Sequence, residues 1–339
     1  MPTAHIHRMI VVLPLFSLVA CASDSAGPSV KVPNQAQYSF SRSEWSTPVN
    51  VGAVVNSAAG EMNAALSPDE LSLYFTSDRA GGQGSTDIWV SRRDCARCPW
   101  QIPVNLGISF NSASQDAGPR FSNDGHLLFF QSDRLATSGG GDIYVSRRDN
   151  PNDDFGWGPP IHLGPQVNTT TFQENAADYL QSAEPGSGNL YFNRAKLAIP
   201  AAPPLPAVPG IPPEIYYASV SRDGEIRGDA VFVPELNLPT ANDQHVTIRK
   251  DGRELFFSSN RSGTGITNLG GFDIWTSTRR SANERWSAPI NVGAALNTAV
   301  NDMQPSLSSD GRTIVFASNR ADGSGGLDLW ISTRTPSGN

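Results

Sequence analysis

The sequence contains few residues of the kinds that most enzyme signatures require. It has only three cysteines and five histidines among 339 residues. The G-x-S-x-G motif of serine hydrolases, the H-E-x-x-H motif of zinc proteases and a phosphate-binding Gly-Lys loop are all missing. These absences favour a non-enzymatic role, and they leave chemistry by carboxylates alone as the remaining catalytic route.

Positive charge is also scarce. The formal net charge is −7 and the isoelectric point is about 5.2. A nucleic-acid partner requires a basic face, so we expect none, and electrostatic adhesion to anionic lipid is excluded on the same ground. No apolar run approaches the roughly 20 residues of a membrane-spanning helix.

The first twenty residues have the features of an export signal. A basic start precedes a short apolar run at 9–16, and small residues follow. The sequence Leu18-Val19-Ala20-Cys21 resembles the bacterial lipobox, in which the cysteine is acylated and becomes the new N-terminus. The resemblance implies a lipid anchor at Cys21, and Ala22 after it implies the outer membrane, facing the periplasm. The alternative is an ordinary signal peptide with an incidental cysteine.

The segment that follows, 21–40, is small, polar and contains proline, so it is predicted to be a flexible tether. The remaining cysteines form the C-x-x-C pair Cys95 and Cys98. Export favours a disulfide between them. A zinc site is disfavoured, because it needs four ligands and the sequence has no second cysteine pair. Redox-active C-x-x-C pairs usually open a helix, whereas this pair lies between two predicted strands.

One stretch of sequence occurs repeatedly. Residues 66–93 read LSPDELSLYFTSDRAGGQGSTDIWVSRR, and close copies occupy 121–148, 248–279 and 307–334. A degraded copy occupies 189–195 and 214–222. Each copy has apolar strand patterns, three copies have an Asp-Gly turn, at 124–125, 251–252 and 310–311, and all but the degraded copy have a Gly-rich loop. Trp-x-x-Pro and a fourth short strand follow three of the copies. A regular repeat of this size predicts units that bury their apolar faces only by stacking.

Four antiparallel strands per copy predict an all-β, five-bladed β-propeller over 41–335. The last copy ends at Arg334 and has no fourth strand after it. Residues 45–52 have the sequence pattern of a fourth strand, but no copy precedes them. We therefore expect this N-terminal strand to complete the last blade and close the ring, which removes two exposed sheet edges.

The pattern S-x-D-G-x-x-(L/I)-x-F-x-S-x-R…G-G-x-D-(I/L)-(W/Y) resembles the WD40-like β-propeller repeat of TolB-like periplasmic proteins. The resemblance extends over 41–335. The third copy departs from it, with Glu214 in place of the Asp and 185–188 in place of the Asp-Gly turn. The resemblance implies a propeller that binds a partner, and it is nearly silent on activity.

Two sets of acidic residues recur once per blade. One set lies in the third strand next to recurring arginines, and because it recurs in every blade we interpret it as structural. These residues are Asp87, Asp142, Glu214, Asp273 and Asp328, with Arg79, Arg134, Arg194, Arg261 and Arg320.

The second set precedes each first strand and is predicted to ring one mouth of the central channel. It comprises Glu61, Asp116, Glu174, Asp243 and Asp302. Polar residues that vary between blades follow closely, and Asn63, His245 and Gln304 are candidate ligand contacts. The acids either anchor the connection between blades through backbone hydrogen bonds, or bind a cation or a polar ligand such as a glycan. His245 is the only histidine near the ring, and packing is the alternative role for it.

A proline-rich insertion, 196–213, replaces the Gly-rich loop of the third copy. We expect it to adopt polyproline II, to stay out of the sheet and to emerge on the face of the acidic ring, as a lid, a handle for a partner or a loose loop.

Taken together, the sequence predicts a monomeric, lipid-anchored binding or scaffold module of the cell envelope. It would bind an envelope protein or a glycan at the acidic face, with no cofactor other than a divalent cation in the channel. The alternative is a carbohydrate-active enzyme that uses two of the five ring acids, an inverting pair of which would stand about 6.5–9.5 Å apart.

Overall fold

The computed structural model describes residues 1, 40, 43–137, 140–182, 187–196, 198 and 210–336. The chain divides into two compact units, Met1–Pro33 and Asn34–Asn339. Every described strand belongs to the second unit. The predicted signal, Cys21 and most of the tether lie outside the described residues.

The second unit consists of five four-stranded antiparallel sheets. Blade one contains β2 (Glu61–Leu66), β3 (Ser72–Ser77), β4 (Asp87–Arg92) and β5 (Val104–Asn105). Blade two contains β6 (Asp116–Phe121), β7 (Leu127–Thr137), β8 (Gly140–Arg147) and β9 (Ile161–His162). Blade three contains β10 (Gln173–Gln181), β11 (Ser187–Lys196), β12 (Ile211–Ser221) and β13 (Val231–Phe232). Blade four contains β14 (Asp243–Ile248), β15 (Glu254–Ser259), β16 (Asp273–Thr278) and β17 (Ile290–Asn291). Blade five contains β18 (Asp302–Leu307), β19 (Thr313–Ser318), β20 (Asp328–Thr333) and β1 (Val49–Asn50).

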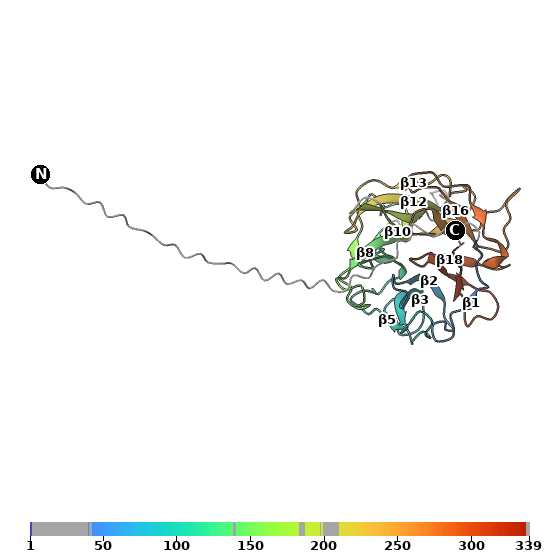
Figure 1. Cartoon of the computed structure of the whole chain (residues 1–339), viewed down its shortest axis with the longest axis horizontal. Coiled ribbons are helices and arrows are strands. Elements are labelled where there is room, and N and C mark those ends of the chain that lie inside the picture. Colours follow the sequence, from blue (N-terminus) through green and yellow to red (C-terminus); the bar gives the residue numbers. More distant parts are fainter. Residues whose placement is uncertain are drawn as a thin grey trace, which may run out of the picture. The chain divides into compact units, whose positions relative to one another are not determined.

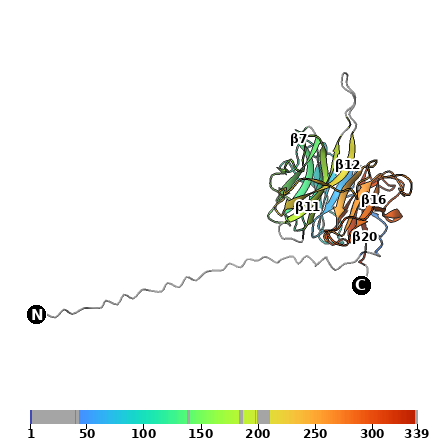
Figure 2. The same ribbon diagram turned by 90° about the horizontal axis from the view of Figure 1, so that it is seen from above.

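The first strands of successive blades contact one another in a closed cycle, β2, β6, β10, β14, β18 and back to β2. Figure 1 shows β2, β10 and β18 toward the middle of the propeller, and β5, β13 and β1 toward its rim. In the side view of Figure 2, the long strands β7, β11 and β12 run between the two faces. The first strands therefore surround the central channel.

The hydrophobic core lies between neighbouring blades. Tyr74 of blade one packs with Phe130 of blade two in one cluster. Phe75 of blade one packs with Val315 and Leu329 of blade five in another. Each blade buries both faces only against its neighbours, which is why the apolar strand patterns must recur in every copy.

The N-terminal strand closes the ring, as predicted. Val49 pairs with Ile331 and Asn50 with Trp330, so β1 is the outer strand of blade five. The amide of Ser46 also donates to the carbonyl of Thr333 at 2.8 Å. The five-bladed architecture and its closure are confirmed.

The proline-rich insertion is shorter than predicted. Ile211, Pro212 and Pro213 belong to β12 and do not stay out of the sheet, and Lys196 pairs with Ile211 after an irregularity in the ladder. Proline lacks only the N–H donor, so it is accepted where that position of the ladder needs no donor. Of the residues between 196 and 210, only Ala198 is described.

The loop between β4 and β5 contains a disulfide between Cys95 and Cys98, at the place where the sequence predicted it. Within the described ranges there is no helix long and apolar enough to cross a bilayer.

Candidate functional site

The five ring acids begin or nearly begin the first strands, as predicted, but their side chains are buried. Their exposed fractions are 0 or 1%. Asp116 accepts the hydroxyl of Ser112 at 2.7 Å and Nη2 of Arg134 at 2.6 Å. The same Arg134 nitrogen donates to the carbonyl of Phe110 at 2.8 Å. This arrangement anchors the connection between two blades to the second strand.

All five blades repeat this ion pair. The pairs are Glu61–Arg79, Asp116–Arg134, Glu174–Arg194, Asp243–Arg261 and Asp302–Arg320. The recurring arginines therefore pair with the ring acids. Their spacing in sequence had suggested pairs with the third-strand acids instead. Binding of a ligand by the ring acids stays a prediction, and any ligand would have to reach carboxylates that already hold these partners.

The third-strand acids accept hydrogen bonds from the Gly-rich loops. Asp273 accepts the amide of Leu269 at 2.6 Å and the side-chain amide of Asn291 at 2.7 Å. Asp87 likewise accepts loop amides and Asn105. These carboxylates fold the Gly-rich loop over the blade, which is the structural role that we expected of them.

Two residues after each ring acid, the backbone is left-handed. The φ angles are 50° at Asn63, 68° at Gly118, 53° at Ala176, 57° at His245 and 57° at Gln304. Four of these five residues are not glycine, so the conformation is strained and has to be held by neighbours. Each falls within the irregularity of the first strand, where the ladder to the second strand shifts register.

The amide of each left-handed residue donates to a side chain of a neighbouring blade. The acceptors are Thr76 for Gly118, Gln131 for Ala176, Asn193 for His245 and Ser258 for Gln304. At the closing seam the corresponding position is Ala317, which has no acceptor. There Gln304 itself accepts the amide of Asn63 at 3.1 Å. The candidates Asn63, His245 and Gln304 therefore belong to one hydrogen-bonded ring.

Further along the first strands, the charged side chains of Arg120 and Asp178 are buried. The guanidinium of Arg120 on β6 donates to the carbonyl of Ala64 at 2.8 Å and to that of Pro305 at 3.3 Å, so it bridges three first strands. Asp178 accepts the amide of Ile248 at 2.7 Å. Burial raises the pKa of Asp178, and the nearby Lys250 and Arg120 oppose that rise.

His245 is a neutral hydrogen-bonding group in this setting. Burial, together with the charge of Arg120, lowers its pKa to about 3. Its Nδ1 is buried without a partner among the described atoms. A histidine that stays neutral throughout the physiological range takes up no second ring proton there, but it can hydrogen-bond to a hydroxyl.

The mouth of the channel combines amides with apolar side chains. Asn175 and Gln244 on blades three and four are half-buried, as are Met62 and Met303 on blades one and five. The side-chain oxygen of Asn175 is buried without a partner in the described chain. Groups of this kind suit a ligand with both hydroxyl and apolar surface.

Two carboxylates on this face were missed by the sequence analysis. Asp78 and Asp133 stand between the recurring Ser and Arg of blades one and two, where blades four and five carry Asn260 and Asn319. Both aspartates are exposed. Asp78 accepts the amide of Gly60 at 2.8 Å, and Asn319 accepts that of Asn301 at 3.0 Å, so these side chains lie beside the start of the first strands. Their variation between blades is the signal that could have revealed them.

Two carboxyl groups near this face have pKa values raised above their ordinary values. For Asp133 the cause is first its partial burial and then the charges of Asp116 and Asp142. For Glu174 burial raises the pKa to about 7, against the opposing hydrogen bonds from Thr169 and Arg194. A raised pKa at an exposed carboxyl such as Asp133 is characteristic of groups that donate protons, whereas Glu174 is buried and paired with Arg194. In the described part of the chain, no three His, Cys, Asp or Glu side chains cluster as a metal site would require.

No family model matches the chain, and no curated protein is similar to it at a significant level. Solved structures with the same fold do exist. An α-L-arabinofuranosidase from Podospora anserina, solved with cellotriose, is 12% identical over 86% of this chain and 97% of its own, with a TM-score of 0.51. The α-L-arabinofuranosidase from Lactobacillus brevis is 13% identical over 84% and 92%, also with a TM-score of 0.51. A family 117 glycoside hydrolase from Zobellia galactanivorans is 11% identical over 89% and 92%, with a TM-score of 0.50.

These comparisons correct the family prediction. The similar structures are glycoside hydrolases and not WD40-like or TolB-like repeat proteins, so the assignment to that family was wrong, and so was the scaffold role that accompanied it. The physical reason is that Asp-Gly turns, buried strands and loop-capping carboxylates build any regular propeller blade. At 11–13% identity the likeness shows the fold alone: the chain is a five-bladed β-propeller of four-stranded sheets.

Proposed function

We propose that the protein is a carbohydrate-active enzyme that hydrolyses a glycosidic bond at the mouth of its central channel. The observation that carries this proposal is the pair Asp78 and Asp133, two exposed carboxylates on neighbouring blades. Glycoside hydrolysis typically requires two carboxyl groups with different roles, one that donates a proton and one that acts as base or nucleophile.

The surroundings of the two groups support different roles. Asp133 has a raised pKa, caused by partial burial and by the charges of Asp116 and Asp142, so it is the better proton donor to a leaving oxygen. Asp78 accepts the amide of Gly60, which orients its carboxylate at the start of β2. We assign Asp133 as the general acid and Asp78 as the base or nucleophile.

The first strands around the mouth supply groups that can hold a sugar. Asn175, Gln244 and the neutral His245 offer hydrogen bonds to hydroxyls, and Met62 and Met303 offer apolar surface. The five buried ring acids hold the framework on which these groups stand, because each is paired with an arginine. This differs from the catalytic use of two ring acids that the sequence analysis considered.

The experiment is a hydrolysis screen with nitrophenyl glycosides and soluble polysaccharides. We expect wild type to cleave at least one substrate. Asp78→Asn should lower kcat by about 10²-fold or more on every cleaved substrate, and Asp133→Asn should do so on polysaccharides, because their leaving oxygen needs a proton and a nitrophenolate does not. Asn319→Ala, at the equivalent position of blade five, is the matched control and should retain activity within about twofold. A protein that cleaves no saccharide, or an Asp133→Asn variant as active as wild type on polysaccharides, would overturn the proposal.

We also propose the cellular location from the sequence alone. The lipobox-like Leu18–Cys21 segment supports acylation of Cys21 and anchoring at the outer membrane, facing the periplasm. A monomeric state is proposed with it. A glycan of the envelope or of the periplasm would then be the substrate within reach.

A further inference from the structure

We propose that the groove between blades three and four is a second binding site, specific for the carboxylate of a sugar acid such as a hexuronate. This site goes beyond the proposed hydrolysis. Asn189 and Tyr191 lie toward the beginning of β11, whereas Asn193, which borders the channel mouth, lies toward its end. The groove therefore opens at the other end of the strands.

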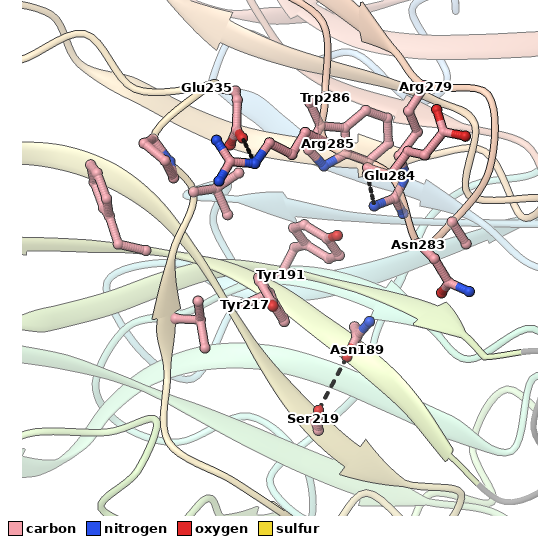
Figure 3. A pocket seen from close by; sticks show the side chains of 15 residues that line it. Asn189, Tyr191, Tyr217, Ser219, Glu235, Arg279, Asn283, Glu284, Arg285 and Trp286 are labelled. Carbon is pink, nitrogen blue, oxygen red and sulfur yellow. Dashed lines mark hydrogen bonds and ion pairs between the residues drawn. The ribbon is translucent and has the colours of Figure 1, made fainter.

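The groove is a cavity of about 590 Å³ between β12, β13 and the loop that joins β16 to β17. Figure 3 shows Tyr191, Tyr217, Asn189 and Ser219 on one side, and the loop residues Arg279 to Trp286 on the other. Tyr191 is 2% exposed and Phe232 is 40% exposed, so the floor is polar and buried, while the open rim has an apolar part at Phe232 and a charged part at Glu235 and Arg285.

The groove between blades one and two shows how the same architecture binds a carboxylate. There Asp154, itself buried, accepts the hydroxyl of Ser72 at 2.7 Å and that of Tyr74 at 2.9 Å. Arg92 and Arg148 complete the ion pairs. The indole of Trp157 donates to the Tyr74 hydroxyl at 3.1 Å, which orients that hydroxyl. The carboxylate comes from the loop before Trp157.

The groove of blades three and four repeats a tyrosine, an arginine and a tryptophan of those that surround this carboxylate, whereas Ser219 stands at the register position of Arg92. By strand register, Tyr191 occupies the position of Tyr74 and Asn189 that of Ser72. The guanidinium of Arg279 lies 4.0 Å over the ring of Trp286, as that of Arg148 lies 4.3 Å over Trp157.

The backbone contact of the arginine is repeated as well. Nε of Arg279 donates to the carbonyl of Gly252 at 2.6 Å, and Nε of Arg148 donates to that of Gly125 at 2.8 Å. The two arginines are therefore held in the same way in the two grooves.

The carboxylate also differs. Nine positions separate Arg148 from Trp157, but only seven separate Arg279 from Trp286, so the second loop is shorter. Its Glu284 offers Arg279 only a backbone carbonyl, at 3.4 Å. The side chain of Arg285 is 89% exposed and pairs with Glu235 at 3.5 Å. Within the described ranges, no carboxylate is bonded to the side chains of Tyr191 or Arg279.

The donors that remain fit an external carboxylate, and the rim fits a sugar. Burial raises the pKa of Tyr191, so its hydroxyl remains a donor at neutral pH. The rings of Tyr217 and Phe232 offer faces for a pyranose, and Asn189, Ser219 and Asn283 offer partners for its hydroxyls. A volume of this size accommodates one or two sugar units.

The test is isothermal titration of the full chain with glucuronate, glucose and acetate. We expect glucuronate to bind at least tenfold more tightly than glucose or acetate. Tyr191→Phe removes one hydrogen bond to the carboxylate and should weaken glucuronate binding about tenfold. The matched control is Tyr74→Phe in the first groove, which should leave glucuronate binding unchanged.

Asn189→Ala is a second variant at the groove, used if Tyr191→Phe melts more than a few degrees below wild type, and it should also weaken binding. Equal binding of glucose would overturn the assignment of a carboxylate ligand. If acetate binds as tightly as glucuronate, the assignment of a sugar to the ligand is overturned. Absence of glucuronate binding at millimolar concentration, or unchanged binding by both groove variants, would overturn the site itself.

Discussion

The side-chain oxygen of Gln304 accepts the backbone amide of Asn63 at 3.1 Å, across the seam between the last blade and the first. Elsewhere in the ring, the corresponding amide is bound by a second-strand side chain such as Thr76 or Ser258. Blade five has Ala317 at that position. One glutamine thus substitutes for the missing acceptor at the point where the propeller closes.

Replacing this glutamine should weaken the seam. Gln304→Ala leaves the amide of Asn63 buried without a partner, and we expect a loss of about 1–3 kcal/mol in the free energy of unfolding. Urea denaturation followed by tryptophan fluorescence measures it. The rescue variant is Gln304→Ala with Ala317→Ser, which restores an acceptor where blade four has Ser258. A double variant no more stable than the single one would contradict this account of the seam.

The buried ion pairs should matter far more than the exposed ones. Asp116→Asn leaves Arg134 without its counter-charge in a buried position, and we expect a loss of about 3–5 kcal/mol. Arg222→Ala breaks the pair with Asp124, in which the arginine side chain is 68% exposed, and should cost less than about 1 kcal/mol. Chemical denaturation of both variants checks the ranking, and equal losses would argue against it.

His245 should make the protein sensitive to acid. Its pKa is lowered from 6.5 to about 3 in the folded chain by burial and by Arg120. Between these two values the unfolded chain binds the proton and the folded chain does not, so stability falls as the pH falls. The loss is about 1.4 kcal/mol per pH unit below 6.5, or about 2 kcal/mol at pH 5.

His245→Asn removes this titration and keeps a residue that tolerates the left-handed backbone. We expect the variant to lose about 2 kcal/mol less than wild type between pH 7.5 and pH 5. Glu174, with its raised pKa, makes the folded chain more stable as the pH falls. This opposite contribution is present in both proteins and cancels in the comparison. Parallel stability curves for the two proteins would show that His245 does not titrate in this way.

The lipid anchor can be tested without any knowledge of the substrate. Cys21→Ala should move the protein from the detergent phase to the aqueous phase in Triton X-114 partitioning of whole-cell extracts, because the acyl chains are lost. Cys95→Ala with Cys98→Ala removes the other two cysteines and serves as the control, which should stay in the detergent phase. Wild type in the aqueous phase would contradict lipidation.

Much of the fold could be predicted from the sequence because each blade is encoded locally. The Asp-Gly turns, the strand patterns and the unpaired 45–52 segment predicted five sheets and their closure, and Val49 pairs with Ile331 as expected. The end of the insertion could not be predicted, because Pro212 and Pro213 join β12 only through the partner that β11 provides.

The site was harder to predict for two physical reasons. The sequence analysis placed Arg79 beside Asp87, and only the folded geometry shows that it pairs with the buried Glu61. The search for repetition also directed attention to residues that build blades. Asp78 and Asp133 break the repeat, and they are the exposed carboxylates at the same face.

The two-residue strand β1 brings the two chain termini of the propeller together on one outer edge, next to Trp330 and Ile331. Deleting 45–52 would leave blade five with three strands and expose the outer edge of β20, whereas linking 45 to 335 and cutting within 94–99 would keep every sheet complete. A circular permutant can therefore begin in another blade while the cyclic order of the blades stays the same, provided that β1 still pairs with β20.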